Sequence, residues 1–85
     1  MAGQTRVDTV MTAARHNARC MLATVLDLAD DAIPDSARLG DPEAWDSLAH
    51  LRLILALEAT LGRELDPEQI VGIECLDDIA AILRA

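Results

Sequence analysis

The segment from about Asp46 to Leu61 is so rich in hydrophobic residues that two sides of its predicted helix are apolar. At about 100° per residue, one side is formed by four residues that we expect to face the core: Leu53, Ile54, Leu57 and Leu61. The opposite side, flanked by Arg52 and Glu58, is formed by four others: Leu48, Leu51, Leu55 and Ala59. A surface helix needs only one apolar stripe. We therefore expect the Leu48 side to stay at least partly exposed and to dock an amphipathic partner.

The other hydrophobic residues also recur every three or four positions, which predicts helices rather than strands. The first helix is predicted from Arg6 to about Leu26, with this apolar stripe: Val7, Val10, Met11, Ala14, Ala18, Met21, Leu22 and Val25. A short helix is predicted after Asp66, with Pro67 at its first position and a capping box completed by Gln69. Its expected apolar contacts are Ile70, Val71 and Ile73. A last helix is predicted from near Cys75 to about Arg84. The fold class is all-α, a four-helix bundle of three long helices and one short helix.

The connection from Asp27 to Gly40 is predicted to be a long ordered loop, because proline and glycine punctuate it and acidic residues crowd its start. Leu28, Ile33 and Leu39 are spaced so that they can pin the loop to the bundle. A structureless loop of this length is unusual in a small domain unless it is functional. The following Asp41-Pro42-Glu43 is predicted to form one helical turn, with aspartate as its cap and proline at its first position.

Length and composition limit the classes of function. The chain has 85 residues, enough for one domain over residues 6–85 after a disordered N-terminus at residues 1–5. Its net charge of -8 argues against nucleic acid or an anionic membrane surface as a partner. Most of this charge follows Asp41, where ten acidic residues accompany three arginines. The imbalance favours docking to proteins with basic patches.

Targeting and redox signals are weak. The first residues lack the apolar stretch of a signal peptide, and no run is long enough to span a membrane. The two cysteines do not form a disulfide framework. We therefore expect a cytoplasmic monomer.

Ser47 is predicted to lie in the first turn of the Asp46–Leu61 helix. Backbone N–H groups there have no partner within the helix, and the peptide dipoles add positive character. A phosphate ester on Ser47 would therefore sit where an anion is stabilised. By itself, a serine at a helix start is usually only a cap.

The run Trp45-Asp46-Ser47-Leu48 is followed by a leucine-rich helix and by the turn Glu64-Leu65-Asp66-Pro67-Glu68. Together these residues resemble the acyl carrier protein family, and the resemblance covers roughly Leu22 to Leu83. It implies that Ser47 takes a 4′-phosphopantetheine arm from coenzyme A and that Asp46 assists the phosphopantetheinyl transferase by helping to hold its metal ion. The protein would then be a non-catalytic carrier of thioesters, served by a loading enzyme and by a downstream transferase or synthase.

The sequence departs from fatty-acid carriers of this family on the predicted docking helix. Ala49, Arg52 and Ala59 occupy positions that are frequently acidic in those proteins. The chain therefore looks more like a discrete acyl carrier from polyketide or mixed peptide–polyketide biosynthesis, a pathway type that includes antibiotic biosynthesis. Two alternatives stay open: an aminoacyl or peptidyl carrier of a nonribosomal-peptide-type pathway, and an unmodified helical adaptor that uses the same exposed side.

Other reactive side chains do not assemble into a site in the sequence. His16 and Cys20 share a helix face, but a metal site or a reactive thiol would need further groups. His50 is expected to be packed or partly exposed, and Trp45 to pack, with contact to the arm or to a partner as alternatives. Cys75 stands where the family usually has a hydroxyl cap, so it is either a poor cap or a packed small residue. We expect no metal site and no catalytic residue.

Overall fold

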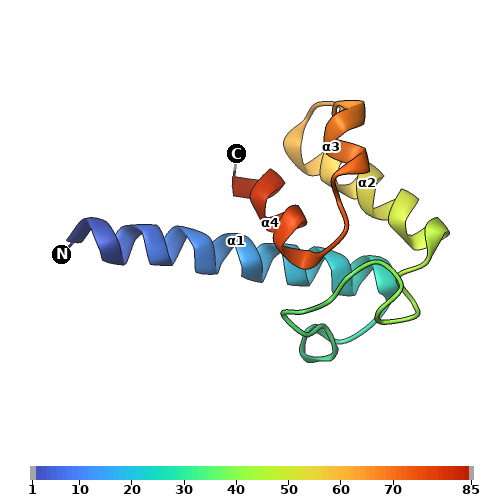
Figure 1. The fold of residues 1–85 in the computed structure, drawn as a ribbon, viewed down its shortest axis with the longest axis horizontal. Coiled ribbons are helices and arrows are strands. Elements are labelled where there is room, and N and C mark those ends of the chain that lie inside the picture. The colour runs from blue at the N-terminus through green and yellow to red at the C-terminus, as the bar shows by residue number, and fades with distance from the viewer. Residues whose placement is uncertain (1, 85) are drawn as a thin grey trace.

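The computed structural model describes the backbone of residues 2–84 and the side chains of residues 13–84. Four α-helices and one 3-10 turn follow one another: α1 (Ala2–Leu26), η1 (Asp30–Ala32), α2 (Ser47–Leu61), α3 (Pro67–Val71) and α4 (Leu76–Arg84). Figure 1 shows α2 and α4 on the same side of α1, with α3 at the far end of α2. The predicted all-α fold with one short helix is confirmed.

The long helix α1 begins at Ala2, four residues before the predicted start at Arg6. Its first turns project past the other helices in Figure 1, where they lie beyond the end of α4. Three members of the predicted stripe, Val7, Val10 and Met11, lie outside the side chains that the structure describes. The disorder expected for residues 1–5 stays a prediction.

The core lies where α1 packs against α4 and α2. Aliphatic side chains dominate it, and its largest fully buried members are these: Trp45, Leu22, Leu53, Leu57, Ile73, Leu76 and Ile79. In α2 the predicted inner side is confirmed, since Leu53 and Leu57 are completely buried and Ile54 nearly so. The core therefore fixes the rotation of α2 about its axis, and with it the direction of the opposite side.

The ends of the helices follow local chemistry. Gly62 ends α2 with φ 70°, a left-handed conformation that glycine adopts without a Cβ penalty, as predicted. Asp66 and Gln69 form the predicted capping box of α3, where the Asp66 N–H donates to the Gln69 side chain at 3.0 Å. Val71 does not supply the expected apolar contact, because its side chain is 79% exposed. The short α3 therefore rests on Ile70, which is half-buried, and on the buried Ile73 that follows it.

The loop between α1 and α2 differs from its prediction in two places. Ile33 is buried as expected, but Leu28 and Leu39 are exposed, and the second pinning residue is Ala37. Asp41 does not cap a helical turn, because it exchanges two backbone hydrogen bonds of 2.8 Å with Arg38. The two residues between them turn the chain, and Gly40 has φ 92°. The chain then makes a non-helical turn in which the Trp45 N–H donates to Pro42 O at 3.0 Å. The predicted helical turn is therefore absent, and two consecutive non-helical turns lead into α2.

The same loop pairs with the segment that precedes α4. The Leu76 N–H donates to Ala37 O at 3.0 Å, and the Leu39 N–H donates to Glu74 O at 2.8 Å. Two residues of the loop thus share backbone hydrogen bonds with a segment far along the chain. The loop enters α2 from a fixed position, which sets the place of Ser47.

Candidate functional site

Ser47 is the first residue of α2, and its side chain is exposed. Asp46 is the N-cap, with extended backbone angles, and its Oδ1 accepts the Ala49 N–H at 2.9 Å. The Asp46 carbonyl accepts the His50 N–H at 2.8 Å. For Ser47 and Leu48, the residue four positions earlier lies outside α2. Their backbone N–H groups therefore have no acceptor within the helix and lie at its N-terminal end. An accessible hydroxyl therefore lies at the positive end of the helix dipole.

The chain contains a second Asp-Ser pair, Asp35-Ser36, which shows what the helix adds. Ser36 is also exposed, but it lies in a turn of the loop. Ser36 does not begin an α-helix, and no row of leucines follows it. An aspartate precedes each of the two serines, so the helix start is what distinguishes Ser47. The chain has no other serine.

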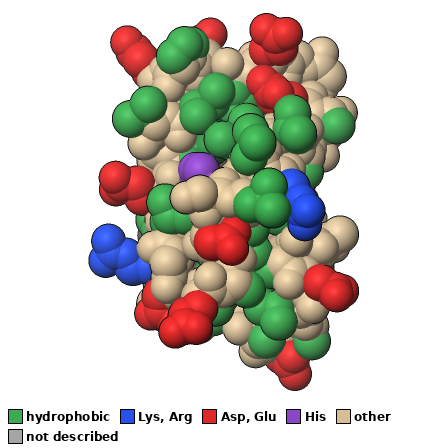
Figure 2. All heavy atoms as spheres, turned by 90° about the vertical axis from the view of Figure 1, so that its right-hand side faces the viewer, with side chains coloured by type: hydrophobic (Ala, Val, Ile, Leu, Met, Phe, Trp, Pro, Cys, Tyr) green, Lys and Arg blue, Asp and Glu red, His purple; other side chains and the backbone are tan. Residues whose placement is uncertain are grey.

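The outer side of α2 is exposed, as predicted. Leu48, Leu51 and Leu55 are 58%, 54% and 57% exposed. Together with the exposed Arg52 and Ala59, we call these residues the α2 face. Figure 2 views the molecule from the right-hand side of Figure 1 and shows hydrophobic side chains gathered on the surface, with a basic side chain at their edge. A cluster of exposed leucines beside an exposed hydroxyl is a feature of binding surfaces.

Two residues near this face behave differently from the sequence prediction. Ala49 is buried, because it faces the core one turn before Leu53, so its alanine says nothing about docking. Glu58 is half-buried, and its Oε2 accepts the Leu65 N–H at 2.9 Å. The carboxylate of Glu58 therefore holds the chain that leaves α2. Of the residues compared with fatty-acid carriers, Arg52 and Ala59 are the two that lie on the α2 face.

Trp45 is completely buried directly before the helix. Its Nε1 donates to Nδ1 of His50 at 3.0 Å, and the two rings stack with centroids 6.0 Å apart. Burial lowers the pKa of His50 from its usual 6.5. The acceptor role of Nδ1 and this lowered pKa both favour the neutral imidazole. Trp45 was expected to pack and His50 to be packed or partly exposed, but no sequence pattern predicted the bond between them.

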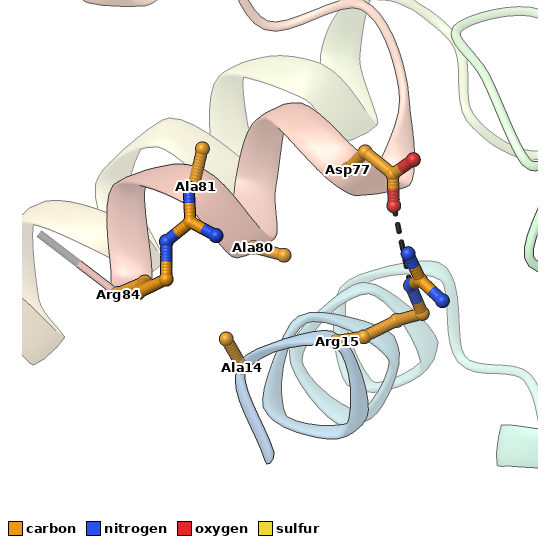
Figure 3. Close-up of a pocket in the computed structure, with 6 residues that line it drawn as sticks. All are labelled: Ala14, Arg15, Asp77, Ala80, Ala81 and Arg84. Carbon is orange, nitrogen blue, oxygen red and sulfur yellow. Dashed lines mark hydrogen bonds and ion pairs between the residues drawn. The ribbon is translucent and has the colours of Figure 1, made fainter. Parts of the chain in front are cut away.

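A shallow groove lies between α1 and α4. It has a volume of about 190 Å³ and is lined by Ala14, Arg15, Asp77, Ala80, Ala81 and Arg84 (Figure 3). Figure 3 shows Arg15 reaching from α1 to Asp77 at the start of α4, where Arg15 Nε and Asp77 Oδ1 form an ion pair 3.2 Å apart. None of the lining residues belongs to α2. The groove is therefore not part of the Ser47 site.

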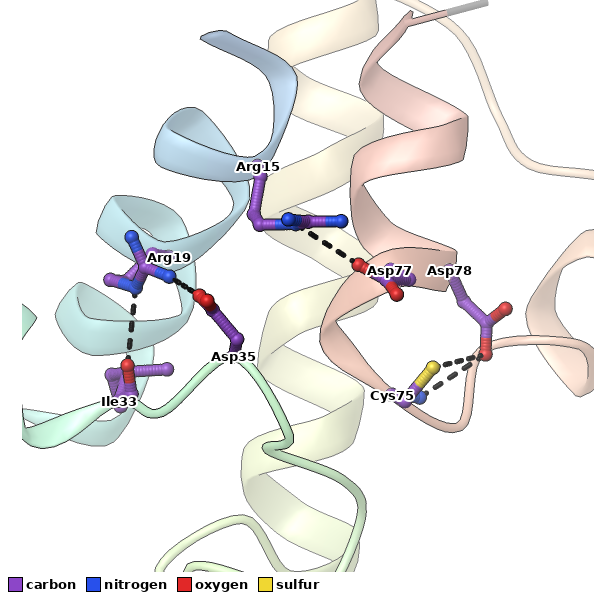
Figure 4. A network of polar contacts seen from close by, with 7 residues as sticks. All are labelled: Arg15, Arg19, Ile33, Asp35, Cys75, Asp77 and Asp78. Carbon is purple, nitrogen blue, oxygen red and sulfur yellow. Dashed lines mark hydrogen bonds and ion pairs between the residues drawn. The ribbon is translucent and has the colours of Figure 1, made fainter. Parts of the chain in front are cut away.

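Arg19 ties the loop to α1. Its Nε donates to Ile33 O at 3.1 Å, and its guanidinium forms an ion pair with Asp35 (Figure 4). On the other side of the loop, Cys75 precedes α4, and its N–H and Sγ both donate to Asp78 Oδ2 (Figure 4). The carboxylate of Asp78, in the first turn of α4, thus satisfies the Cys75 N–H. This explains how cysteine can stand where the family usually has a residue with a capping hydroxyl.

Cys20 contacts two polar side chains, but the contact with Asp30 opposes reactivity. Its Sγ donates to Asp30 Oδ2 at 3.3 Å and lies 3.6 Å from Nε2 of His16. The hydrogen bond to Asp30, with smaller effects of desolvation and of the Asp30 charge, raises the pKa of the Cys20 thiol. The thiolate is the reactive form, so a raised pKa argues against a nucleophile. In the part of the chain with described side chains, no three metal-binding residues cluster.

A scan against protein-family models matches the family described as phosphopantetheine attachment site, over residues 18–83. The chain belongs to this family. A search of the curated proteins finds no match. Family members carry a covalently attached 4′-phosphopantetheine arm and act as carriers without catalysing a reaction. The protein is therefore a carrier that works with a phosphopantetheinyl transferase and with biosynthetic enzymes.

The described residues fit such an arm. A phosphodiester needs an accessible hydroxyl and a site that tolerates negative charge, and the start of α2 offers both in the exposed Ser47. Among residues 2–84, no helix has the length and hydropathy needed to cross a membrane.

Proposed function

We propose that Ser47 carries the 4′-phosphopantetheine arm and that the protein is an acyl carrier in polyketide or related secondary-metabolite biosynthesis. The observation that supports this most directly is the exposed Ser47 hydroxyl at the first position of α2, directly after its N-cap. Members of the matched family carry this arm, and the positive end of the α2 dipole is a favourable place for its phosphate. The arm's thiol would hold the acyl group as a thioester.

The chain's own residues have separate tasks in this function. Asp46 holds the first turn by accepting the Ala49 N–H, and in the family's pattern it also assists the transferase. Transfer joins the Ser47 oxygen to phosphorus and releases the nucleotide half of coenzyme A, while the hydroxyl proton passes to the transferase. The tether then raises the local concentration of cargo near each enzyme.

The docking surface in this proposal is the α2 face together with Glu58, so its members are Leu48, Leu51, Arg52, Leu55, Glu58 and Ala59. Its charge pattern supports the polyketide assignment, since Arg52 and Ala59 stand at two exposed positions that are frequently acidic in fatty-acid carriers. The expected partners are the transferase, an acyl-loading enzyme and a downstream transferase or synthase. Cytoplasmic location and a monomeric state belong to the same proposal.

Intact-protein mass spectrometry tests the attachment. The apo-protein is incubated with coenzyme A and a broad-specificity phosphopantetheinyl transferase, and we expect a gain of one arm. Ser47→Ala should abolish the gain, whereas Ser36→Ala, which removes the other exposed serine, should keep it. An unchanged mass, or a gain that survives in Ser47→Ala, would refute the proposal.

The cargo is tested on the holo-protein. Purified acyltransferases and amino-acid-activating ligases are offered the same preparation, and the thioester product is weighed. Loading by an acyltransferase supports the acyl assignment. Loading only by an amino-acid-activating ligase would instead make the protein an aminoacyl carrier.

A further inference from the structure

Arg52 is a cation without a carboxylate neighbour on its own helix. Side chains three and four residues apart are neighbours on a helix surface, and at these spacings Arg52 has leucine or alanine: Leu48, Ala49, Leu55 and Ala56. No hydrogen bond or ion pair within the described part of the chain involves its guanidinium. Arg15 and Arg19, by contrast, are paired with Asp77 and Asp35.

The other charged residue beside the exposed leucines is already engaged. Glu58 lies on the opposite edge of the row from Arg52, and its Oε2 is bonded to the Leu65 N–H. The two edges of the α2 face therefore differ. One edge carries a free guanidinium, and the other carries a carboxylate that is drawn toward the end of the helix.

A partner that covers the exposed leucines must also cover the base of Arg52, since Leu48 and Leu55 are its neighbours. Removing an unpaired charge from water is unfavourable, whereas a carboxylate opposite the guanidinium offsets that cost with a charge-assisted hydrogen bond. The net charge of -8 acts over longer distances, which salt screens beyond about 8 Å at physiological ionic strength. Local complementarity at Arg52 therefore decides the preferred partner surface more than the total charge does.

We propose that the α2 face docks a partner protein whose surface combines an apolar stripe with a carboxylate opposite Arg52. This rests on the proposed function in that the partner is one of the enzymes that load or unload the carrier. It goes further by giving that enzyme's docking surface an acidic group, although the carrier itself is strongly acidic. Arg52 is then a specificity-determining residue.

Two amphipathic helical peptides with the same leucine stripe test the chemistry directly. One has glutamates along the stripe and the other has lysines, and each is titrated with apo-protein by fluorescence anisotropy. We expect Arg52→Gln to weaken binding of the glutamate peptide about threefold, as for an exposed ion pair, and Arg52→Glu to weaken it further. The lysine peptide should bind Arg52→Glu at least as tightly as it binds the unchanged protein.

Arg63→Glu is the matched control, because it makes the same charge change just beyond α2, where the Arg63 guanidinium donates to the Glu64 carbonyl and pairs with no carboxylate among the described residues. An equal response to Arg63→Glu and Arg52→Glu would refute the proposal, since it would show an effect of total charge alone. Failure of the glutamate peptide to bind the unchanged protein would refute it too. So would sedimentation as a dimer that Arg52→Glu dissociates, because a second copy would then occupy the face.

The enzyme assay gives the functional readout. With the enzyme that loads the holo-protein, Arg52→Glu should raise KM and leave kcat nearly unchanged, and an unchanged KM would count against the proposal. The peptide titrations use apo-protein, so they read Arg52 whether or not Ser47 accepts an arm. Failure of the attachment would appear in the mass spectra alone. Circular dichroism of each variant verifies that the helices are intact.

Discussion

The indole of Trp45 and the imidazole of His50 form a hydrogen bond of 3.0 Å across the start of α2. Trp45 is buried directly before the helix, and its backbone carbonyl also accepts the Gly40 N–H at 2.9 Å. One residue thus joins the loop, the core and the first turn of α2. Ser47 lies between the two partners in sequence, so the bond steadies the turn that presents its hydroxyl.

This bond should make stability depend on pH. Nδ1 accepts the bond and burial lowers the pKa of His50, so the folded protein favours neutral imidazole more than the unfolded chain does. In the unfolded chain His50 has its ordinary pKa of 6.5, so below this pH the unfolded chain binds more protons than the folded protein does. The free energy of unfolding therefore falls as the pH drops below that value. Above pH 6.5 the contribution is fully present.

His50→Gln isolates the effect, because the glutamine oxygen can accept from Trp45 and does not titrate. Urea unfolding at pH 7.5 and 5.5 should show a larger loss of stability for the unchanged protein than for His50→Gln. Equal losses would mean that His50 does not contribute to the pH dependence. The difference between the two losses of unfolding free energy excludes the pH effect of the carboxylates, which both proteins share.

Asp46 has a structural task that can be separated from recognition by the transferase. Asp46→Ala removes the acceptor for the Ala49 N–H and should lower the free energy of unfolding by about 1 kcal/mol. Asp46→Asn keeps an acceptor and should cost far less. If Asp46 also assists the transferase through its charge, Asp46→Asn should slow attachment of the arm at nearly unchanged stability. Urea unfolding and timed mass spectrometry measure the two effects, and full attachment rates in Asp46→Asn would limit Asp46 to capping.

The features that sequence predicted well depend on neighbours along the chain. The two sides of α2, the left-handed Gly62 and the Asp66–Gln69 capping box each follow from residues within one or two turns. Helical spacing puts Leu53 and Leu51 on different sides of α2, and the charged residues beside Leu51 mark its side as the outer one. The exposed Ser47 at the start of α2 was predicted in the same way, because it needs only a helix start and its cap.

Three features that sequence missed involve the loop between α1 and α2, where no periodic pattern applies. The turn at Asp41 forms because Arg38 pairs with it, and proline after aspartate gave the same local signal as a helix start. Ala37 is buried and Leu39 is exposed, although both share backbone hydrogen bonds with the segment before α4. The Trp45–His50 bond likewise needs the geometry of the loop, which no periodic pattern encodes.

The two sides of α2 give a matched pair of substitutions. Leu53→Ala empties part of the core, where Leu53 is completely buried, and should cost about 3 kcal/mol of unfolding free energy. Leu51→Ala changes a side chain that is 54% exposed, and its cost should be within about 0.5 kcal/mol. Leu51→Ala should stay folded but bind partner enzymes less tightly than the unchanged protein does. Loss of stability in Leu51→Ala would show that the α2 face is not free.

Arg19 should control how firmly the loop holds the start of α2. It bonds to the Ile33 carbonyl and pairs with Asp35, so Arg19→Ala frees both ends of this contact. We expect backbone amides in residues 27–46 to exchange hydrogen faster, with a loss of about 1 kcal/mol in unfolding free energy. Arg15→Ala is the control, because it removes an ion pair with Asp77 between α1 and α4 and leaves the loop contacts in place. Hydrogen exchange measured by mass spectrometry compares the two variants. Equal protection of residues 27–46 in both would show that the buried Ile33 and Ala37, rather than Arg19, hold the loop.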